Sequence, residues 1–230
     1  MKKFISLSKH PGTTGQYYYT KFFNQNNIDA TYIPQGTDNL AQSLAVALEE
    51  EVDGISISMP YKQEIIQYLD YADSLVTRYQ SCNTVLIKNK KLFGFNTDFY
   101  GANYIISQIP DHLTVSILGD GSMGTMIKLM LKNDPLVISR KSNNWNDRHK
   151  LRGAVINCTS FGTATLDSPF SALPTLELVI DLAIKNNQLE EQCQQGNVKY
   201  IHGIEFYKYQ FQKQFEIYTG TSINIDEVYK

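Results

Sequence analysis

The segment Ser56-Ile57-Ser58-Met59-Pro60-Tyr61-Lys62 joins an apolar run to polar groups, and Gly94-Phe95-Asn96-Thr97-Asp98 repeats that pattern further along the chain. Open α/β sheets present their chemistry where strands end and helices begin. Pro60 favours a helix start, because its missing N–H costs nothing in a first turn. We therefore expect a strand over 55–58, a helix from Pro60, and Lys62 and Asp98 together in one cleft.

The composition is that of an ordinary soluble globular protein. The 230 residues are 42% hydrophobic and 19% charged, which allows one large domain or two small ones. The 21 basic and 23 acidic residues are scattered along the chain, so nothing indicates a nucleic-acid or membrane partner. No stretch approaches the roughly 20 apolar residues of a membrane span. We expect a small-molecule substrate, and a monomer or homodimer.

The cysteines and histidines do not have the spacing of a metal site. Cys82, Cys158 and Cys193 are odd in number and far apart, which argues against both a disulfide framework and a zinc site. The basic and briefly apolar start is too short for a signal peptide. These features favour a reducing, cytoplasmic location and no metal. No metal or catalytic role is assigned to His10, His112, His149 or His202.

The first half of the chain alternates strands with helices, which predicts a parallel sheet. The expected strands cover 4–8, 30–33 and 55–58. One expected helix carries Tyr17, Tyr18, Phe22 and Phe23 at helical spacing. The next has Leu40, Leu44 and Leu48 on one face, with Thr37 or Asp38 as its cap. A short helix over 73–79 precedes two apolar runs, 83–88 and 91–95. Because only Asn89-Lys90 separates these runs, they are typical of a hairpin.

A glycine motif opens the second half, after an expected helix over 98–109. Gly119, Gly121 and Gly124 follow an apolar strand over 113–118 and precede a helix over 125–132. This G-x-G-x-x-G spacing suits a tight turn whose backbone touches a pyrophosphate at a helix N-terminus. The pattern indicates a dinucleotide site, and the alternative is an ordinary tight turn between strand and helix.

The next strand, 136–139, ends in Arg140-Lys141 instead of an acid. An acid there would bind the ribose hydroxyls of NAD, whereas a basic pair suits the additional 2′-phosphate of NADP. The alternative is a solvated basic loop. Only residues 141–153 separate this strand from the next one, which predicts a compact nucleotide unit. A unit that lacks one strand is compatible with this short spacing. Strands over 154–158, 178–182 and 198–201 follow, and then a helix from Gly203 that stops at Gly220. A last short helix is expected over 223–229.

This ordered set of segments resembles the shikimate dehydrogenase family over nearly the whole chain. The segment 56–62 is similar to the family's N-V-T-I-P-H-K motif, which implies that its catalytic lysine is Lys62. Gly94-Phe95-Asn96-Thr97-Asp98 matches G-x-N-T-D and implies Asp98 as catalytic aspartate. The N-T motif falls on Asn83-Thr84 and the G-x-x-x-x-x-x-Q signature ends at Gln210, so the resemblance implies that Asn83 and Gln210 bind substrate.

The resemblance also covers the cofactor side. Residues 157–162 are similar to the N-A-T-P-x-G loop, and the D-L strand end falls on Asp181-Leu182. The implied fold is two-domain α/β, with a substrate domain over 1–98 and 205–230, to which C-terminal helices return, and a Rossmann-like NADP domain over 99–204. The cleft would lie between the two. The implied cofactor residues are Gly119, Gly121, Ser122, Met123, Gly124, Arg140, Lys141, Thr159 and Gly203.

Departures from the family pattern affect the substrate-binding positions more than the catalytic ones. The family's paired serines fall on Thr13 and Gly15, and a family tyrosine aligns with Ile184. The N-V-T motif has become Ser56 and Ser58, of which Ser58 is expected to bind substrate, as is Thr13. Each unpaired substrate group costs on the order of 1–3 kcal/mol, so the substrate is sensitive to these changes.

The implied activity is NADP-dependent interconversion of 3-dehydroshikimate and shikimate, or of a related polyol acid, in aromatic amino acid biosynthesis. Lys62 would be the general acid and Asp98 would orient the substrate. Taken without the resemblance, the same residues would be a solvated lysine and a helix cap, and the polar residues would have turn roles. The alternatives are a non-catalytic nucleotide- or metabolite-binding member and a quinate- or aminoshikimate-type dehydrogenase.

Overall fold

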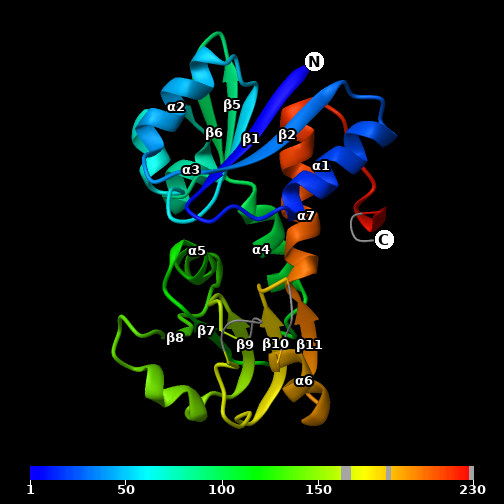
Figure 1. Cartoon of the computed structure of the whole chain (residues 1–230). Coiled ribbons are helices and arrows are strands. Elements are labelled where there is room, and N and C mark those ends of the chain that lie inside the picture. The colour runs from blue at the N-terminus through cyan, green and yellow to red at the C-terminus, as the bar shows by residue number, and fades with distance from the viewer. Residues whose placement is uncertain (162–166, 185–187, 228–230) are drawn as a thin grey trace. The chain divides into compact units, whose positions relative to one another are not determined.

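The computed structural model describes residues 1–161, 167–184 and 188–227 (Figure 1). The chain forms two compact units. Unit 1 is Met1–Thr97 with Gln210–Lys230, and unit 2 is Asp98–Tyr209. The chain thus returns to unit 1 inside its long last helix, α7 (Gly203–Thr219), a few residues later than the expected boundary. Among the described residues, no helix combines the length and apolar character needed to cross a membrane.

Unit 1 is built on a mixed six-stranded sheet in the order β2-β1-β3-β5-β6-β4. Strands β1, β2 and β3 pair in parallel, as predicted, but β5 runs antiparallel to β3 and β6, so the sheet as a whole is not parallel. The predicted hairpin is confirmed: Asn89 and Lys90 both have positive φ, at 52° and 61°, as a two-residue type I′ turn requires. The strand bounds are β1 Lys2–Ser8, β2 Ala30–Gly36, β3 Gly54–Ile57, β4 Tyr71–Ala72, β5 Thr84–Lys88 and β6 Lys91–Phe95.

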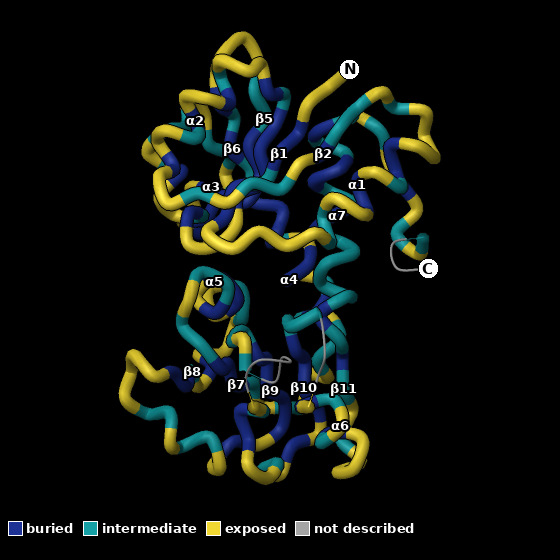
Figure 2. Tube along the Cα trace, in the orientation of Figure 1, coloured by how far each residue is buried: buried dark blue, intermediate teal, exposed yellow. Residues whose placement is uncertain are grey.

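Strand β1 shows how the two faces of this sheet are covered. Ile5 and Leu7 point into an aliphatic core with α2 (Leu40–Glu49) and α3 (Ser74–Tyr79). Phe4 points the other way, because side chains alternate along a strand, and its ring lies 5.7 Å from that of Phe23 in α1 (Thr14–Gln25) and 4.8 Å from that of Tyr218 in α7. Figure 2 shows that β1 is buried over most of its length and exposed at its start.

Two local predictions in unit 1 are wrong. The cap of α2 is Asn39, whose side chain accepts the Gln42 N–H at 3.0 Å, and not Thr37 or Asp38. No α-helix starts at Pro60: residues 59–63 form turns, and a short 3-10 helix, η1, covers Glu64–Tyr68. The Lys62 carbonyl accepts the Cys82 N–H at 2.8 Å, so this tertiary hydrogen bond occupies a carbonyl that an α-helix would use internally.

Unit 2 contains an all-parallel five-stranded sheet in the order β11-β10-β9-β7-β8. Counted from the β8 edge in chain order this is 2-1-3-4-5, a doubly wound sheet whose direction of winding reverses between β7 and β9. The short crossover from β8 to β9 holds only the 3-10 helix η2 (Trp145–Lys150). The strand bounds are β7 Val115–Leu118, β8 Leu136–Ile138, β9 Gly153–Asn157, β10 Leu176–Asp181 and β11 Lys199–His202.

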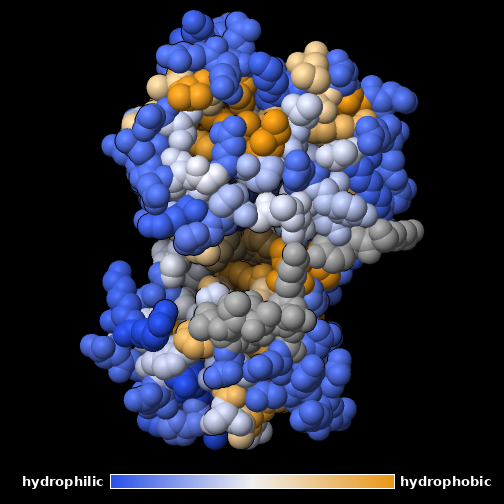
Figure 3. Space-filling view, in the orientation of Figure 1, coloured by the Kyte–Doolittle hydropathy of each residue, from blue (hydrophilic) through white to orange (hydrophobic). Residues whose placement is uncertain are grey.

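The helices of unit 2 are α4 (Asp98–Ser107), α5 (Ser122–Met130), α6 (Gln188–Gln195) and the start of α7. Gly101 lets α4 approach α7 closely, because a Cβ there would lie 2.5 Å from the Phe206 carbonyl oxygen. Helix α6 was not predicted, and its buried positions are Leu189 and Cys193. The last 3-10 helix, η3 (Ile225–Glu227), replaces the short helix expected over 223–229, of which 228–230 lie outside the described residues. Figure 3 shows hydrophilic side chains over most of the visible face of each unit.

Candidate active site

The polar residues expected in unit 1 gather at one edge of its sheet. The parallel strands β1 and β3 end there, since the Ser58 N–H donates to the Leu7 carbonyl at 2.9 Å. Strand β6 also ends there and β5 begins, because Thr84 is paired with Phe95. This edge therefore carries the loops after β1, β3 and β6, which is where an open α/β sheet places its ligand.

Lys62 lies in the turns that follow β3 and is half-buried. The hydrogen bond from the Cys82 N–H to the Lys62 carbonyl fixes this turn beside residue 83. The Ile57 N–H donates to the Asn83 carbonyl at 2.8 Å, which ties the end of β3 to the same point. The backbones of Lys62 and Asn83, twenty-one positions apart, are thus neighbours.

Asn83 and Thr97 form a buried hydrogen-bonded pair. The Asn83 Nδ2 atom donates to Thr97 Oγ1 at 2.9 Å, and Asn83 Oδ1 accepts the Thr97 N–H at 2.8 Å. The Thr84 hydroxyl also donates to Asn83 Oδ1, at 2.9 Å. Both members of the pair are almost fully buried, at 4% and 0% exposure. A polar pair this well satisfied holds its side chains in one orientation.

Helix α7 adds two glutamines to this pair. Gln210 Nε2 donates to Thr97 Oγ1 at 3.1 Å, and Gln214 Nε2 donates to Thr84 Oγ1 at 2.7 Å. Gln214 is itself held by the Tyr19 hydroxyl, which donates to its Oε1 at 2.9 Å. Asn83 and Gln210 were predicted as site residues, whereas no role was predicted for Thr97, Thr84 or Gln214. The available signals were the threonine inside the G-x-N-T-D match and a second glutamine one helical turn after Gln210.

The remaining expected substrate residues lie on the surface of unit 1. Ser58 is exposed just after β3, and Thr13 is exposed before α1, where its side chain forms no cap. The Lys9 N–H donates to the Met59 carbonyl at 3.2 Å, so the loops that carry Thr13 and Ser58 run side by side at their bases. Gly15 faces Tyr32: a Cβ at Gly15 would lie 3.3 Å from the ring, so Tyr32 fills the space that a larger side chain would need.

Asp98 is the first residue of α4 and belongs to unit 2. It therefore lies in the first turn of the helix, and a role as helix cap stays a prediction beside the catalytic one. Its carboxyl group is buried, at 3% exposure, where the helix dipole favours a negative charge. Lys62 belongs to unit 1, and joint action of the two stays a prediction.

The glycine turn of unit 2 has a distinct role for each glycine. Gly119 has φ +95°, which makes the tight turn after β7. Gly124 packs α5 onto this turn, because a Cβ there would lie 2.0 Å from the Gly119 carbonyl oxygen. Gly121 has no heavy atom within 4 Å of its Cβ position and leads into Ser122 and Met123 without a side-chain cap. These are the three functions of a dinucleotide-binding turn.

A hydrogen-bond network across β9, β10 and β11 supports this turn. Asn157 Oδ1 accepts the Thr159 hydroxyl at 2.6 Å, and the Thr159 methyl group covers Gly119, 2.9 Å from its Cβ position. Asn157 Nδ2 donates to the buried Asp181 carboxylate at 3.1 Å, and the Tyr200 hydroxyl donates to the same carboxylate at 3.2 Å. Burial, and then the negative charge of Asp181, raise the pKa of Tyr200, so it remains a donor.

Arg140 and Lys141 follow Ser139 just beyond the end of β8, and both are exposed. The Arg140 guanidinium lies 5.4 Å from the centre of the Phe161 ring, which orients it by a cation–π contact. Gly203, at the start of α7, packs against the loop after β10, because a Cβ there would lie 2.6 Å from the Leu182 carbonyl. Gly162 of the matched loop lies outside the described residues. All described cofactor positions thus lie at strand carboxyl ends or at helix starts.

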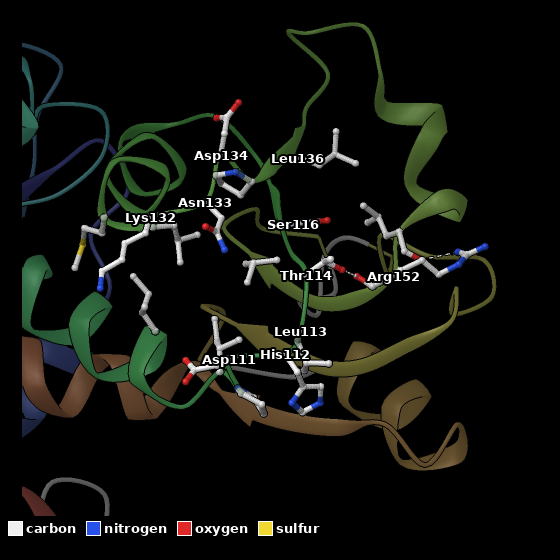
Figure 4. Close-up of a pocket in the computed structure, with 18 of the residues that line it drawn as sticks. Asp111, His112, Leu113, Thr114, Ser116, Lys132, Asn133, Asp134, Leu136 and Arg152 are labelled. Atoms are coloured by element: carbon white, nitrogen blue, oxygen red, sulfur yellow. Dashed lines mark hydrogen bonds between the residues drawn. The ribbon is translucent and has the colours of Figure 1, made fainter.

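A cavity of about 810 Å³ lies at the opposite edge of the unit 2 sheet. Figure 4 shows its lining, with side chains from the segment before β7, from β7 and from the segment after α5; Asp111, Ser116 and Asn133 are examples. No expected site residue is among its described lining residues. In the described part of the chain, no group of three or more His, Cys, Asp or Glu side chains could hold a metal ion.

Comparison with known proteins agrees with this geometry. The family model for the shikimate dehydrogenase substrate binding domain matches residues 8–85. Shikimate dehydrogenase (NADP(+)) of Staphylococcus aureus strain bovine RF122 / ET3-1 is 31% identical, over 90% of this chain and 88% of that protein. The same enzyme of strain JH9 is 30% identical over the same shares.

Solved structures share the fold. Shikimate 5-dehydrogenase of Thermus thermophilus, in complex with NADP(H) and shikimate, has a TM-score of 0.83 at 21% identity, covering 99% of this chain and 97% of that one. The 5-ketofructose reductase of Gluconobacter sp. strain CHM43 has a TM-score of 0.77 at 18% identity, covering 99% and 96%. The fold is therefore α/β with two domains, one of them Rossmann-like. Because a relative at 31% identity matches nearly the whole length, the chain belongs to the shikimate dehydrogenase family.

Proposed function

We propose that this protein is an NADP-dependent oxidoreductase that interconverts 3-dehydroshikimate and shikimate, or a closely related polyol acid. The observation that carries the proposal is the glycine turn, in which Gly119, Gly121 and Gly124 each have the geometry that a dinucleotide needs. The similar enzymes of Staphylococcus aureus support the choice of NADP and shikimate by their names.

The nucleotide binds to unit 2. The backbone N–H groups of Ser122 and Met123 at the start of α5, with the open space over Gly121, receive the pyrophosphate. Arg140 and Lys141 bind the 2′-phosphate. Thr159 and Gly203 line the same nucleotide site at the carboxyl ends of the strands. NADP in its reduced form supplies the hydride.

The substrate binds at the polar edge of unit 1. Asn83 and Gln210, held by Thr97, donate or accept hydrogen bonds to its hydroxyl groups, and exposed Ser58 and Thr13 add further hydroxyls. A site prearranged in this way loses little side-chain entropy when it binds a polyol.

Proton transfer is assigned to Lys62. Its ammonium group donates a proton to the ketone oxygen as negative charge develops there, and takes it back in the reverse direction. Asp98 accepts a hydrogen bond from the neighbouring substrate hydroxyl and orients it. Lys62 lies in a half-buried turn, where it is accessible to a small molecule.

The substrate has a second candidate class. Gly15 and Ile184 supply none of the hydroxyls that the family pattern has at these positions, and Tyr32 fills the space at Gly15. A fold neighbour reduces 5-ketofructose, according to its name. A polyol ketone that needs no hydrogen-bonding partner at positions 15 and 184 is therefore the alternative substrate, and a binding protein without turnover is the non-catalytic alternative.

The test is an assay of NADPH oxidation by purified protein with a panel of ketones, in which the decrease in NADPH absorbance measures the rate. We expect turnover with 3-dehydroshikimate; oxidation only with the ketones that correspond to quinate or aminoshikimate, or with 5-ketofructose, would reassign the substrate. Absence of turnover with every ketone, together with tight NADPH binding, would establish the non-catalytic alternative and refute the proposal.

A further inference from the structure

No acidic residue directly follows β8, but the carboxylate of Asp120, from the glycine turn, lies at that position. Dinucleotide sites place an Asp or Glu about 20 residues beyond the glycines to bind the adenosine ribose, or a basic residue nearby to bind a 2′-phosphate. Ser139 occupies that position here, followed by Arg140. The Ser139 hydroxyl donates to the carboxylate of Asp120, between Oγ and Oδ2, at 2.8 Å.

Asp120 is firmly placed. It lies inside the glycine turn, between Gly119 and Gly121, and the Gly119 N–H donates to the Ile138 carbonyl at 2.8 Å. This backbone bond joins the turn to the end of β8, so the Asp120 side chain is carried to Ser139. Ser139 is itself 2% exposed, with its N–H bonded to Asn144 Oδ1 at 2.9 Å. The carboxylate therefore has a rigid support.

The end of β8 thus presents both signs of charge. Arg140 and Lys141 attract a 2′-phosphate, whereas the Asp120 carboxylate repels it and can accept a hydrogen bond from a free ribose hydroxyl. No side-chain ion pair between Asp120 and a cation is found among the described residues, so its charge is not neutralised by a neighbour.

From these contacts we infer that Asp120 is a coenzyme-specificity residue, which lowers the preference for a 2′-phosphorylated nucleotide that Arg140 and Lys141 confer. The inference rests on the proposed nucleotide site and names the part of it that discriminates NADPH from NADH. Asp120→Asn removes the repulsive charge, keeps an oxygen that can accept the Ser139 hydroxyl, and leaves Arg140 and Lys141 in place.

The test is calorimetric titration of the whole chain with NADPH, NADH, adenosine 2′,5′-bisphosphate and adenosine 5′-monophosphate. Removal of one repulsive charge at a partly exposed site predicts that Asp120→Asn binds both 2′-phosphorylated ligands about fivefold to tenfold more tightly. Affinity for NADH and the monophosphate stays the same or falls. Asp111→Asn removes one charge at the opposite edge of the same sheet. It should change neither the ratio of NADPH to NADH affinity nor the ratio of bisphosphate to monophosphate affinity.

The outcomes separate this inference from the proposed function. If wild-type protein binds NADPH but Asp120→Asn leaves the ratio of NADPH to NADH affinity within twofold, Asp120 has no role in specificity and the inference is overturned. Asp120→Ala, checked for an unchanged unfolding temperature, must shift the ratio in the same direction. If no ligand binds to the wild-type protein, the NADP site is refuted and the inference falls with it.

Discussion

Gln210 donates from Nε2 to Oγ1 of Thr97 at 3.1 Å, across 113 positions of sequence. This bond links the last long helix to the loop after β6, and through Thr97 to Asn83. Asn83 and Gln210, which family motifs imply as substrate residues, are therefore joined by Thr97, which is fully buried. The relationship explains how the edge of the sheet keeps its polar groups in place before any substrate binds.

Thr97→Val should destabilise the protein and weaken substrate binding. The change removes the hydroxyl that Asn83 and Gln210 both contact, and leaving buried donors without partners costs about 1–3 kcal/mol. Urea denaturation measures the loss, and steady-state kinetics should show a raised KM for 3-dehydroshikimate. Thr31→Val, on strand β2, is the matched control and should be nearly neutral. Equal stability of the two variants would contradict the role of Thr97.

Two glycines of the same turn should respond differently to alanine. Gly121→Ala places its Cβ in open space with φ −68°, so the fold should be kept while NADPH affinity falls at least roughly tenfold, because the Cβ blocks the pyrophosphate. Gly124→Ala places its Cβ 2.0 Å from the Gly119 carbonyl oxygen and should destabilise unit 2 itself. Thermal unfolding and NADPH titration distinguish the two. Undiminished NADPH binding by Gly121→Ala would argue that no pyrophosphate lies there.

Arg140→Ala should reduce affinity for NADPH by roughly tenfold and leave NADH unchanged, because a guanidinium pairs with the 2′-phosphate that NADH lacks. Equilibrium fluorescence titration with both coenzymes measures the change. Arg152→Ala removes an exposed positive charge at the opposite edge of the sheet and serves as the control. Equal losses for NADPH and NADH would show that Arg140 does not read the 2′-phosphate.

The stability of the protein at alkaline pH should depend on the buried Cys193 thiol. Burial, aided by the charges of Asp181 and Glu190, raises its pKa to about 12. A folded pKa above the unfolded value means that the native state holds the proton more tightly, so this stabilisation is complete below about pH 8.5 and is lost as pH rises toward 12. The stability difference between wild type and Cys193→Ala should therefore shrink above pH 9, by up to about 1.4 kcal/mol per pH unit. Urea denaturation at about pH 8, 9 and 10 measures it, and a constant difference would count against a buried thiol.

Much of the fold could be predicted because many of its elements are determined by residues close together in the sequence. Asn89-Lys90 between two apolar runs is a short-range signal, and the hairpin formed as expected. The glycine turn was also predicted, since each glycine answers a local backbone need. By contrast, the region of Lys62 depends on the Cys82 N–H, a tertiary partner that no local pattern reveals, so the helix expected from Pro60 did not form.

The candidate site was predicted in part for the same reason. Asn83 and Gln210 came from motif order, whereas Thr97 is a partner only because three distant segments converge on it. Asp120 lies inside a motif chosen for its glycines, and its contact with Ser139 depends on the pairing of β7 with β8. The exposed positions of Ser58 and Thr13 were not deducible, since their residue types suit loops of any exposure.

Lys62 is proposed to transfer the proton in an NADPH-dependent reduction. The most direct measurement is the rate of NADPH oxidation with saturating 3-dehydroshikimate, compared between wild type and Lys62→Ala, with NADPH affinity titrated in parallel. We predict that kcat falls by about 10²–10⁴ while NADPH affinity stays within twofold, because a general acid is lost and the nucleotide turn is untouched. A Lys62→Ala protein that turns over at the wild-type rate would show that Lys62 is not the general acid.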